Sequence, residues 1–186
     1  MKWIGERISF VDHKEYVTFV IYPPNIGNKK YLILIWSLAW LAIGAYVFTQ
    51  FFYDYSEKEK IVLIIFMSFW VYFAVKVFRT LLYLFFGREF IKIDKTALRL
   101  KTATSNYGQA RQFFLENITK FSVLSLKDNS LQNIYDRSPW VRGSNRIHFE
   151  YMGKHYSFGR KLEEKDARLL FGVITKRINQ YLRNKD

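Results

Sequence analysis

Five polar side chains lie at helical spacing within one apolar segment, residues 61–86. Intervals of four, four, three and four residues separate them, so a helix would carry all five on one face: Ser68, Tyr72, Lys76, Arg79 and Tyr83. A charge at the centre of a bilayer costs about 2.5–3.5 kcal/mol, and it usually finds a partner or water. This polar stripe predicts either a seam against the first apolar segment, a second copy or a partner protein, or cations that snorkel to lipid phosphates. As a helix the segment would measure about 39 Å, longer than a bilayer core, which favours snorkelling.

A second group of cations lies where the sequence pattern changes to that of strands. Residues 90–94 and 97–101 alternate apolar and polar side chains around a tight turn, which predicts a hairpin. Because Arg88 ends the preceding apolar segment, we expect this hairpin to begin close to the membrane. Contact with anionic lipid heads is worth about 1 kcal/mol per basic residue, whereas the alternative is an ordinary solvated strand face. The cations concerned are Lys92, Lys95, Arg99 and Lys101.

A third candidate group lies in residues 127–145, the longest stretch without a regular period. Segments of this length in compact domains often carry function. Arg137, Trp140 and Arg142 could anchor a partner there, because tryptophan and arginine dominate binding hot spots. The alternative is that Ile134, Tyr135 and Trp140 form a short strand that packs on the sheet.

Side chains for catalysis are sparse. The chain has no cysteine, which excludes disulfides, thiolate metal sites and cysteine nucleophiles. His13 stands apart, while His148 and His155 could face each other across a hairpin turn at Gly153 and Lys154. Two histidines without a carboxylate cluster make a poor metal site, and no phosphate-binding glycine loop or nucleophile elbow occurs. We therefore expect a protein that is not an enzyme and that carries no metal and no cofactor.

Two long apolar runs must position these groups. Residues 31–53 contain no charged side chain, and residues 61–86 contain only two. The first run would form a helix of about 35 Å, enough to cross a hydrocarbon core of about 30 Å. Residues 54–60 between the runs fit a turn and no domain. The pair therefore predicts a transmembrane helical hairpin.

The charge distribution predicts an orientation. Residues 1–30 carry five basic side chains against three acidic ones, and residues 87–186 carry twenty against ten, whereas residues 54–60 hold three acids and two lysines. Positive charge is retained on the cytoplasmic side of a bilayer. We expect the cell's inner, cytoplasmic membrane, with both termini in the cytoplasm. The net charge of +13 would also suit nucleic acid, but contact with an anionic leaflet explains it more directly. Nucleic acid is therefore not an expected partner.

The segments around the hairpin have the pattern of a small α+β domain. Residues 1–30 form a cytoplasmic segment in which 8–11 and 16–22 predict a β-hairpin. Residues 163–183 carry an apolar stripe at helical spacing. We expect residues 87–186 to form one domain, an antiparallel sheet capped by this C-terminal amphipathic helix.

Strands directly after a two-helix hairpin, followed by a closing helix, give an order of elements that resembles bacterial membrane-anchored PH-like proteins, including the YcxB-like kind. The resemblance rests on Ile91–Asp94 running to Leu98–Leu100, on Ile118–Val123 and on Phe158–Leu162, and it covers about residues 31–183. The two-span assembly factor of photosystem I has a similar order. The resemblance implies a small bent sheet capped by a helix, a scaffold used for lipid heads, peptides and assembly partners alike.

These patterns predict a non-catalytic integral membrane protein that presents a basic binding domain at the cytoplasmic face. It would act as an assembly or scaffold factor, or as a lipid-contacting subunit of a membrane complex. The expected partners are anionic lipid heads and a membrane protein or a second copy. The alternative is a ligand-gated membrane effector whose domain binds a small anionic ligand such as a nucleotide, with Lys76 and Arg79 lining a pore.

Overall fold

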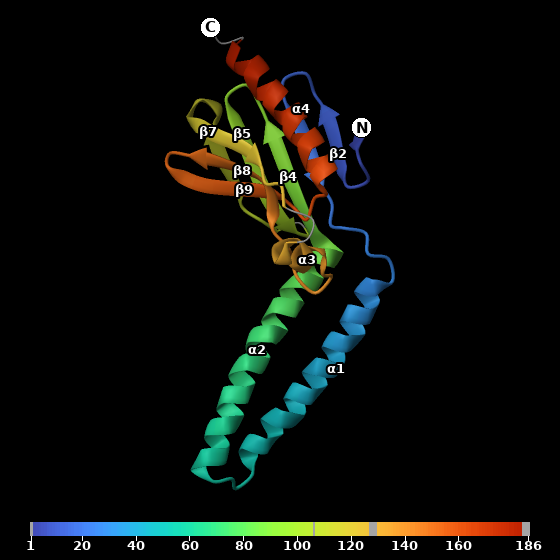
Figure 1. The fold of residues 1–186 in the computed structure, drawn as a ribbon, viewed down its shortest axis with the longest axis vertical. Coiled ribbons are helices and arrows are strands. Elements are labelled where there is room, and N and C mark those ends of the chain that lie inside the picture. Colours follow the sequence, from blue (N-terminus) through green and yellow to red (C-terminus); the bar gives the residue numbers. More distant parts are fainter. Residues whose placement is uncertain (1, 106, 127–129, 184–186) are drawn as a thin grey trace.

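Two long helices form a hairpin that projects from a sheet-rich domain (Figure 1). The structure, a computed structural model, describes residues 2–105, 107–126 and 130–183. Helix α1 spans Lys29–Thr49 and continues into a 3₁₀ turn, η1, at Gln50–Phe52, and α2 spans Glu57–Phe86. Ser56 begins α2 with a capping box, in which its Oγ accepts from the Glu59 N–H and its own N–H donates to the Glu59 carboxylate.

Both helices are long and apolar enough to cross a membrane, as the two apolar runs predict. Only 11% of the most apolar stretch of the first helix, and none of that of the second, is buried inside the molecule. The core helix of a soluble protein would instead be covered by its own fold. Apolar side chains are therefore exposed on the surface along nearly the whole hairpin.

The two helices touch each other along a narrow seam. At the domain end, Ile33 of α1 is buried against Leu81 and Leu84 of α2. Further along, Gly44 of α1 lies directly against the Trp70 indole, because a Cβ built on Gly44 would be 2.1 Å from a ring carbon. A glycine is needed at this position because any side chain would push the helices apart.

The first six strands form one antiparallel sheet in the order β1-β2-β3-β4-β5-β6. The strands are β1 (Lys2–Ile4), β2 (Ile8–Asp12), β3 (Val17–Ile21), β4 (Gly87–Ile93), β5 (Ala97–Thr104) and β6 (Ala110–Phe114). Alternating side chains of the central strands are buried, so one face of this sheet lies against the core. The hairpin of β2 and β3 occupies the segments in which the sequence predicts a hairpin.

The N-terminal segment does not stand apart from the domain. Strand β3 pairs along its length with β4, from Val17 opposite Ile93 to Ile21 opposite Glu89. The helical hairpin is thus inserted between two neighbouring, hydrogen-bonded strands, and residues 1–30 supply half of the sheet. Local sequence patterns cannot reveal a pairing between segments that stand on either side of the helices.

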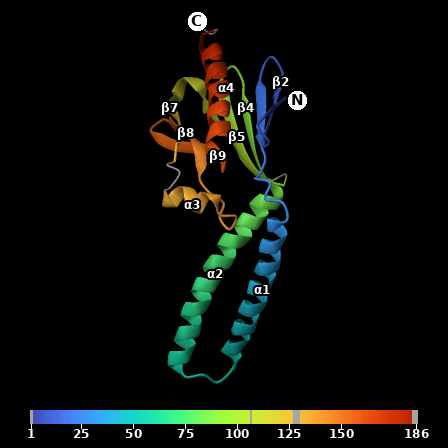
Figure 2. The same cartoon turned by 45° about the vertical axis from the view of Figure 1, so that its right-hand side comes forward.

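A second sheet and the last helix complete the domain. The sheet has the order β7-β8-β9, with β7 at Ile118–Val123, β8 at Asn145–Tyr151 and β9 at Lys154–Arg160. A short 3₁₀ turn, η2 (Leu115–Asn117), leads into it, and α3 spans Leu131–Arg137. Helix α4 (Glu164–Arg183) packs across both sheets, as Figure 2 shows. Both sheets and α4 share one core, which includes Ile8, Phe19, Ile91, Leu98, Ile147, Phe149, Leu170 and Ile174.

The turn between β8 and β9 differs by one residue from the expected one. Met152 and Gly153, not Gly153 and Lys154, form its two-residue loop, and both have positive φ, 50° and 75°. Two positive φ values are those of a type I′ turn, which matches the twist of the strands. As a consequence His148 lies opposite Ser157, so the expected pairing of His148 with His155 is wrong.

Candidate functional site

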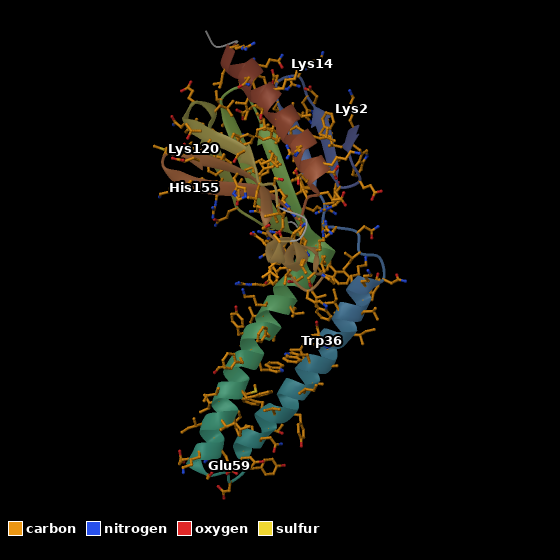
Figure 3. The ribbon with its side chains drawn as sticks, in the orientation of Figure 1. Lys2, Lys14, Trp36, Glu59, Lys120 and His155 are labelled. Carbon is orange, nitrogen blue, oxygen red and sulfur yellow. The ribbon has the colours of Figure 1, made fainter. Side chains whose placement is uncertain are left out.

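Three of the four strand cations expected beside the membrane lie in the half of the sheet far from the hairpin, whereas Lys101 lies opposite Phe90, midway along β4. Strand β4 leaves α2 at Gly87 and runs away from the helical hairpin (Figure 1). At about 3.3 Å per residue its far end is about 20 Å from that point. Lys95 occupies the turn there, beside the β2–β3 turn that carries Lys14, which Figure 3 shows far from the hairpin. We call Lys92, Lys95 and Arg99 the distal basic set.

Two members of the distal basic set, Lys92 and Arg99, make ordinary strand contacts. The Lys92 ammonium lies 3.8 Å from the centre of the Tyr16 ring. Arg99 forms an ion pair of 3.4 Å with Asp94, whose carboxylate accepts from the N–H groups of Thr96 and Ala97 at 3.0 and 2.8 Å. Burial would raise the pKa of the Asp94 carboxyl, but these hydrogen bonds outweigh it and the pKa is lowered. Asp94, paired with Arg99, therefore stabilises the turn after β4.

The polar stripe does not face α1. Ser68, Tyr72, Lys76 and Arg79 are exposed, and the residues of α2 that lie towards α1 are apolar, so the expectation of a polar seam with the first helix is wrong. The Ser68 hydroxyl donates to the Ile64 carbonyl at 2.8 Å, and the Lys76 ammonium lies 5.2 Å from the Tyr72 ring centre. The stripe opens outward, to the surroundings of the hairpin.

At the domain end of the stripe, around Tyr83, lies a cluster of cations between the hairpin and the domain. Tyr83 is buried there, and the guanidinium groups of Arg160 and Arg142 lie 5.6 and 5.9 Å from its ring centre. The Tyr83 hydroxyl donates to the Arg160 carbonyl at 3.4 Å. We define the junction cluster as the cations around Tyr83 and Glu89: Arg7, Arg79, Arg142, Arg160 and Lys161.

Arg7 holds three parts of the chain together at this cluster. Its Nε and Nη2 donate to the Tyr22 carbonyl at 3.0 and 2.9 Å, where the chain leaves β3 for the hairpin. The same guanidinium donates to the carbonyls of Arg160 and Lys161, at the corner between β9 and α4. Burial lowers the pKa of Arg7, because desolvation disfavours its charge. Arg7 is thus committed to backbone carbonyls and serves as a structural clamp.

Glu89 is the buried carboxylate of the cluster. It accepts hydrogen bonds from the N–H groups of Gly159 and Arg160 at 2.7 and 3.3 Å. Gly159 has a φ of 78°, which lets the β9 backbone turn its N–H towards the carboxylate. Glu89 thereby fixes the strand that carries Arg160.

Arg142 and Arg160 are not satisfied by their surroundings. Arg142 Nε and Arg160 Nε and Nη1 are buried without a hydrogen-bond partner among the described residues. Burial, and then the charge of Arg160, lower the pKa of Arg142. Two cations held close together with open donors favour an anion at this place.

The loop candidates of the sequence are separated by the fold. Arg137 ends α3 and lines a cleft, whereas Arg142 belongs to the junction cluster. Trp140 reaches the hairpin instead, with its ring centre 4.8 Å from that of Trp36 on α1, in an edge-on contact. Figures 1 and 2 both show α3 at the end of the domain nearest the hairpin. The loop is therefore no strand, and its last part docks on the helices.

A polar cleft of about 970 Å³ lies beside the junction cluster. Its lining includes Arg7, Asp136, Arg137, Arg146 and Lys161. Burial lowers the pKa of Lys161 to about 8, against the opposing influence of the nearby Asp136. Asp136 itself accepts from the Ser144 N–H at 3.0 Å and lies 3.9 Å from an Arg146 nitrogen.

Several residues of the junction cluster cannot be recognised from the sequence alone. Arg7, Glu89 and the adjacent pair Arg160 and Lys161 are not candidates in the sequence, because they stand in three separate segments that only the fold brings together. The spacing of Arg79 and Tyr83 on α2 was the one available signal. In the parts of the chain that the structure describes, no three His, Asp or Glu side chains gather closely enough to hold a metal ion.

Comparison with known proteins adds no relative to this geometry: no protein-family model, no curated protein and no solved structure matches the chain.

Proposed function

We propose that this protein is a non-catalytic membrane protein whose helical hairpin spans the bilayer and whose sheet domain binds at the cytoplasmic surface. The observation that carries the proposal is the exposure of two apolar helices whose domain ends meet a cluster of cations. Helix α2, Glu57–Phe86, is about 45 Å long and exceeds a hydrocarbon core by about 15 Å. With its acidic start at the outer interface, the core would end near residue 80. Lys76 would then lie about 6 Å inside the core and reach the lipid phosphates by snorkelling, and the junction cluster, which includes Arg79, would lie near their level.

The connection of the hairpin to the sheet supports this topology. Strands β3 and β4 are direct neighbours, so the chain enters and leaves the hairpin at one edge of one domain. Both ends of the hairpin must then emerge on the same side of the bilayer. The basic character of residues 1–30 and 87–186, against the acidic segment 54–60, favours the cytoplasm for that side.

For the domain, we propose a PH-like scaffold used for binding. Two antiparallel sheets around a shared core, closed by the amphipathic helix α4, agree with the bent sheet and capping helix that the resemblance implies. A domain fixed to the hairpin through Arg7 and Trp140 would hold its binding groups at a constant height above the membrane. Such a module suits an assembly or scaffold factor, or a lipid-contacting subunit.

Two assays test the membrane part of this proposal. Sodium carbonate should leave the full chain in the membrane pellet, and protease added to intact spheroplasts should spare residues 87–186. Release by carbonate, or trimming of the domain from outside, would contradict it. The binding part is tested with the full chain reconstituted in nanodiscs. The chain should recover a membrane partner from solubilised membranes or prefer anionic lipid. Failure of both would refute the binding function.

The polar cleft supports a second candidate function. A volume of about 970 Å³ with several cations in its lining is roomy enough for a small anionic ligand such as a nucleotide. The exposed stripe of Lys76 and Arg79 could then meet its copies in a ligand-gated pore. Dye leakage from proteoliposomes that depends on an added nucleotide would support this function, and leakage unaffected by every nucleotide tried would exclude it.

A further inference from the structure

We propose that the domain end of the hairpin binds one anionic phospholipid, with its phosphate at the junction cluster and an acyl chain in a crevice between α1 and α2. This inference rests on the proposed function, since it needs the hairpin in a bilayer. It goes further in assigning a specific site and a class of ligand. General attraction of a basic domain to an anionic leaflet requires neither.

The junction cluster supplies the charge that a phosphate needs. Glu89 is the buried carboxylate beside it, and backbone N–H groups already occupy both of its oxygens. Arg142 Nε and Arg160 Nε and Nη1 have no hydrogen-bond partner within the described chain, although both guanidinium groups lie over the Tyr83 ring. Arginine side chains bind phosphate oxygens through two parallel N–H donors, and the interaction is strong where water is partly excluded.

The crevice supplies an apolar lining for a chain. It has a volume of about 280 Å³, and almost all of its surface is apolar. Its walls include Trp36, Trp40, Leu41, Trp70, Ala74 and Phe78. Trp40 and Trp70 stack with ring centres 6.3 Å apart, and their Nε1 groups are buried with no acceptor in the described parts of the chain. With the core ending near residue 80, Trp70 lies about 15 Å deeper along α2, so the crevice is at the depth of acyl chains.

The two parts of the site adjoin each other. Trp36 lines the crevice and also touches Trp140, which stands two residues before Arg142. On α2, Phe78 lines the crevice and Tyr83 underlies the cations, a rise of about 7.5 Å along the helix. Figure 3 shows Trp36 on the domain half of α1, away from Glu59 at the loop end. A single amphipathic molecule aligned with the helices would therefore reach both parts.

Charge argues for a lipid and against a second copy of this chain. The acidic side chains of the hairpin region, Asp54, Glu57 and Glu59, lie at its loop end, far from the junction. A second copy in the same orientation would bring its own Arg79 and Arg142 to this level, and like charges would repel. A phospholipid offers a negative group and an apolar chain at the heights where the site has its cations and its crevice.

Native mass spectrometry of the full chain in a neutral detergent tests this site. Three ligands are titrated: phosphatidylglycerol as the anionic lipid, phosphatidylcholine as a lipid without net charge, and inorganic phosphate as the free anion. Their affinities show whether the site needs a lipid, a net negative charge or only a phosphate. The variants are R142Q/R160Q for the phosphate, A74F to fill the crevice, and K14Q/K154Q as a matched control at two exposed lysines. Melting in lipid-free detergent shows whether each variant is folded.

We expect one phosphatidylglycerol per chain, bound at least about tenfold more tightly than phosphatidylcholine. R142Q/R160Q should reduce this preference by about tenfold or more, A74F should weaken both lipids, and K14Q/K154Q should match the unaltered chain. Equal affinity for the two lipids, or equal effects of both double variants, would overturn the site. Binding of inorganic phosphate as tight as that of the lipid would overturn the role of the crevice. Carbonate release of the unaltered chain would instead refute the membrane proposal itself.

Discussion

Both ends of the sheet domain carry clustered cations, but the cations at the two ends have different neighbours. At the distal end, Arg99 is paired with Asp94 and Lys92 is stacked on Tyr16, so charge is used to finish a turn and cover a strand. At the junction, Arg142 and Arg160 lie close together, half-buried and with open donors. The difference teaches that the number of cations in a segment says little about binding. In the proposed lipid site, their neighbours and their distance from the hairpin set the junction cations apart.

The largest effect should come from separating the junction from its N-terminal strands. A fragment of residues 87–186 lacks β1–β3, and with them the buried side chains of Ile8, Phe19 and Ile21, each worth about 1.5–3 kcal/mol. We expect this fragment to be unfolded by circular dichroism.

The matched comparison keeps those strands and removes only the helices. Because β3 and β4 are neighbours, a chain in which a short glycine-serine loop replaces residues 29–86 should fold as a soluble domain with cooperative melting. A folded 87–186 fragment would contradict the shared sheet.

The next largest effect concerns the buried carboxylate of the junction. Glu89→Ala removes the acceptor for the Gly159 and Arg160 N–H groups and leaves adjacent cations uncompensated. We expect a loss of about 3 kcal/mol in the free energy of unfolding of the soluble domain, measured by urea titration. Glu89→Gln keeps an acceptor oxygen and should lose less. Equal losses would mean that the acceptor oxygen alone contributes nothing, and no loss in Glu89→Gln would mean that the negative charge has no role.

A smaller effect is expected at the distal turn. Asp94→Ala removes the acceptor of the Thr96 and Ala97 N–H groups and should cost about 1 kcal/mol. Since the folded pKa of Asp94 lies below its unfolded value of about 4, its stabilisation is present above that pH and is lost as the pH falls through the folded pKa. The difference between the two chains should therefore shrink below about pH 4. A difference that stays constant from pH 7 to pH 2 would contradict this account of the turn.

The smallest expected change in stability is a gain. Arg142 has a lowered pKa through burial and through the charge of Arg160, so its replacement by methionine relieves repulsion. We expect R142M to leave the stability of the lipid-free protein unchanged or to raise it by up to about 1 kcal/mol, as seen by thermal melting in neutral detergent. A clear loss of stability would make Arg142 a structural residue and weaken the case for an anion site.

Much of the fold could be predicted from local pattern, and most of the site could not. Period and length predicted both apolar helices, the N-terminal hairpin and the final helix, since each depends on neighbouring residues. The pairing of β3 with β4 and the approach of Arg160 to Tyr83 join residues far apart in the sequence. The sequence also does not predict that β4 runs away from the hairpin, because an alternating pattern indicates a strand but not its direction in space. Arg142 was a candidate for its loop position, although its neighbours at the junction explain its role better.

The most direct test of the central claim measures the heights of the two ends above a bilayer. The chain has no cysteine, so single cysteines can carry a fluorophore at Tyr135, which is exposed on α3, and at Lys95 in the distal turn. In vesicles containing lipids spin-labelled at the headgroup, we predict strong quenching at position 135 and little at position 95. Equal quenching at both positions, or stronger quenching at position 95, would contradict the placement of the junction at the lipid phosphates.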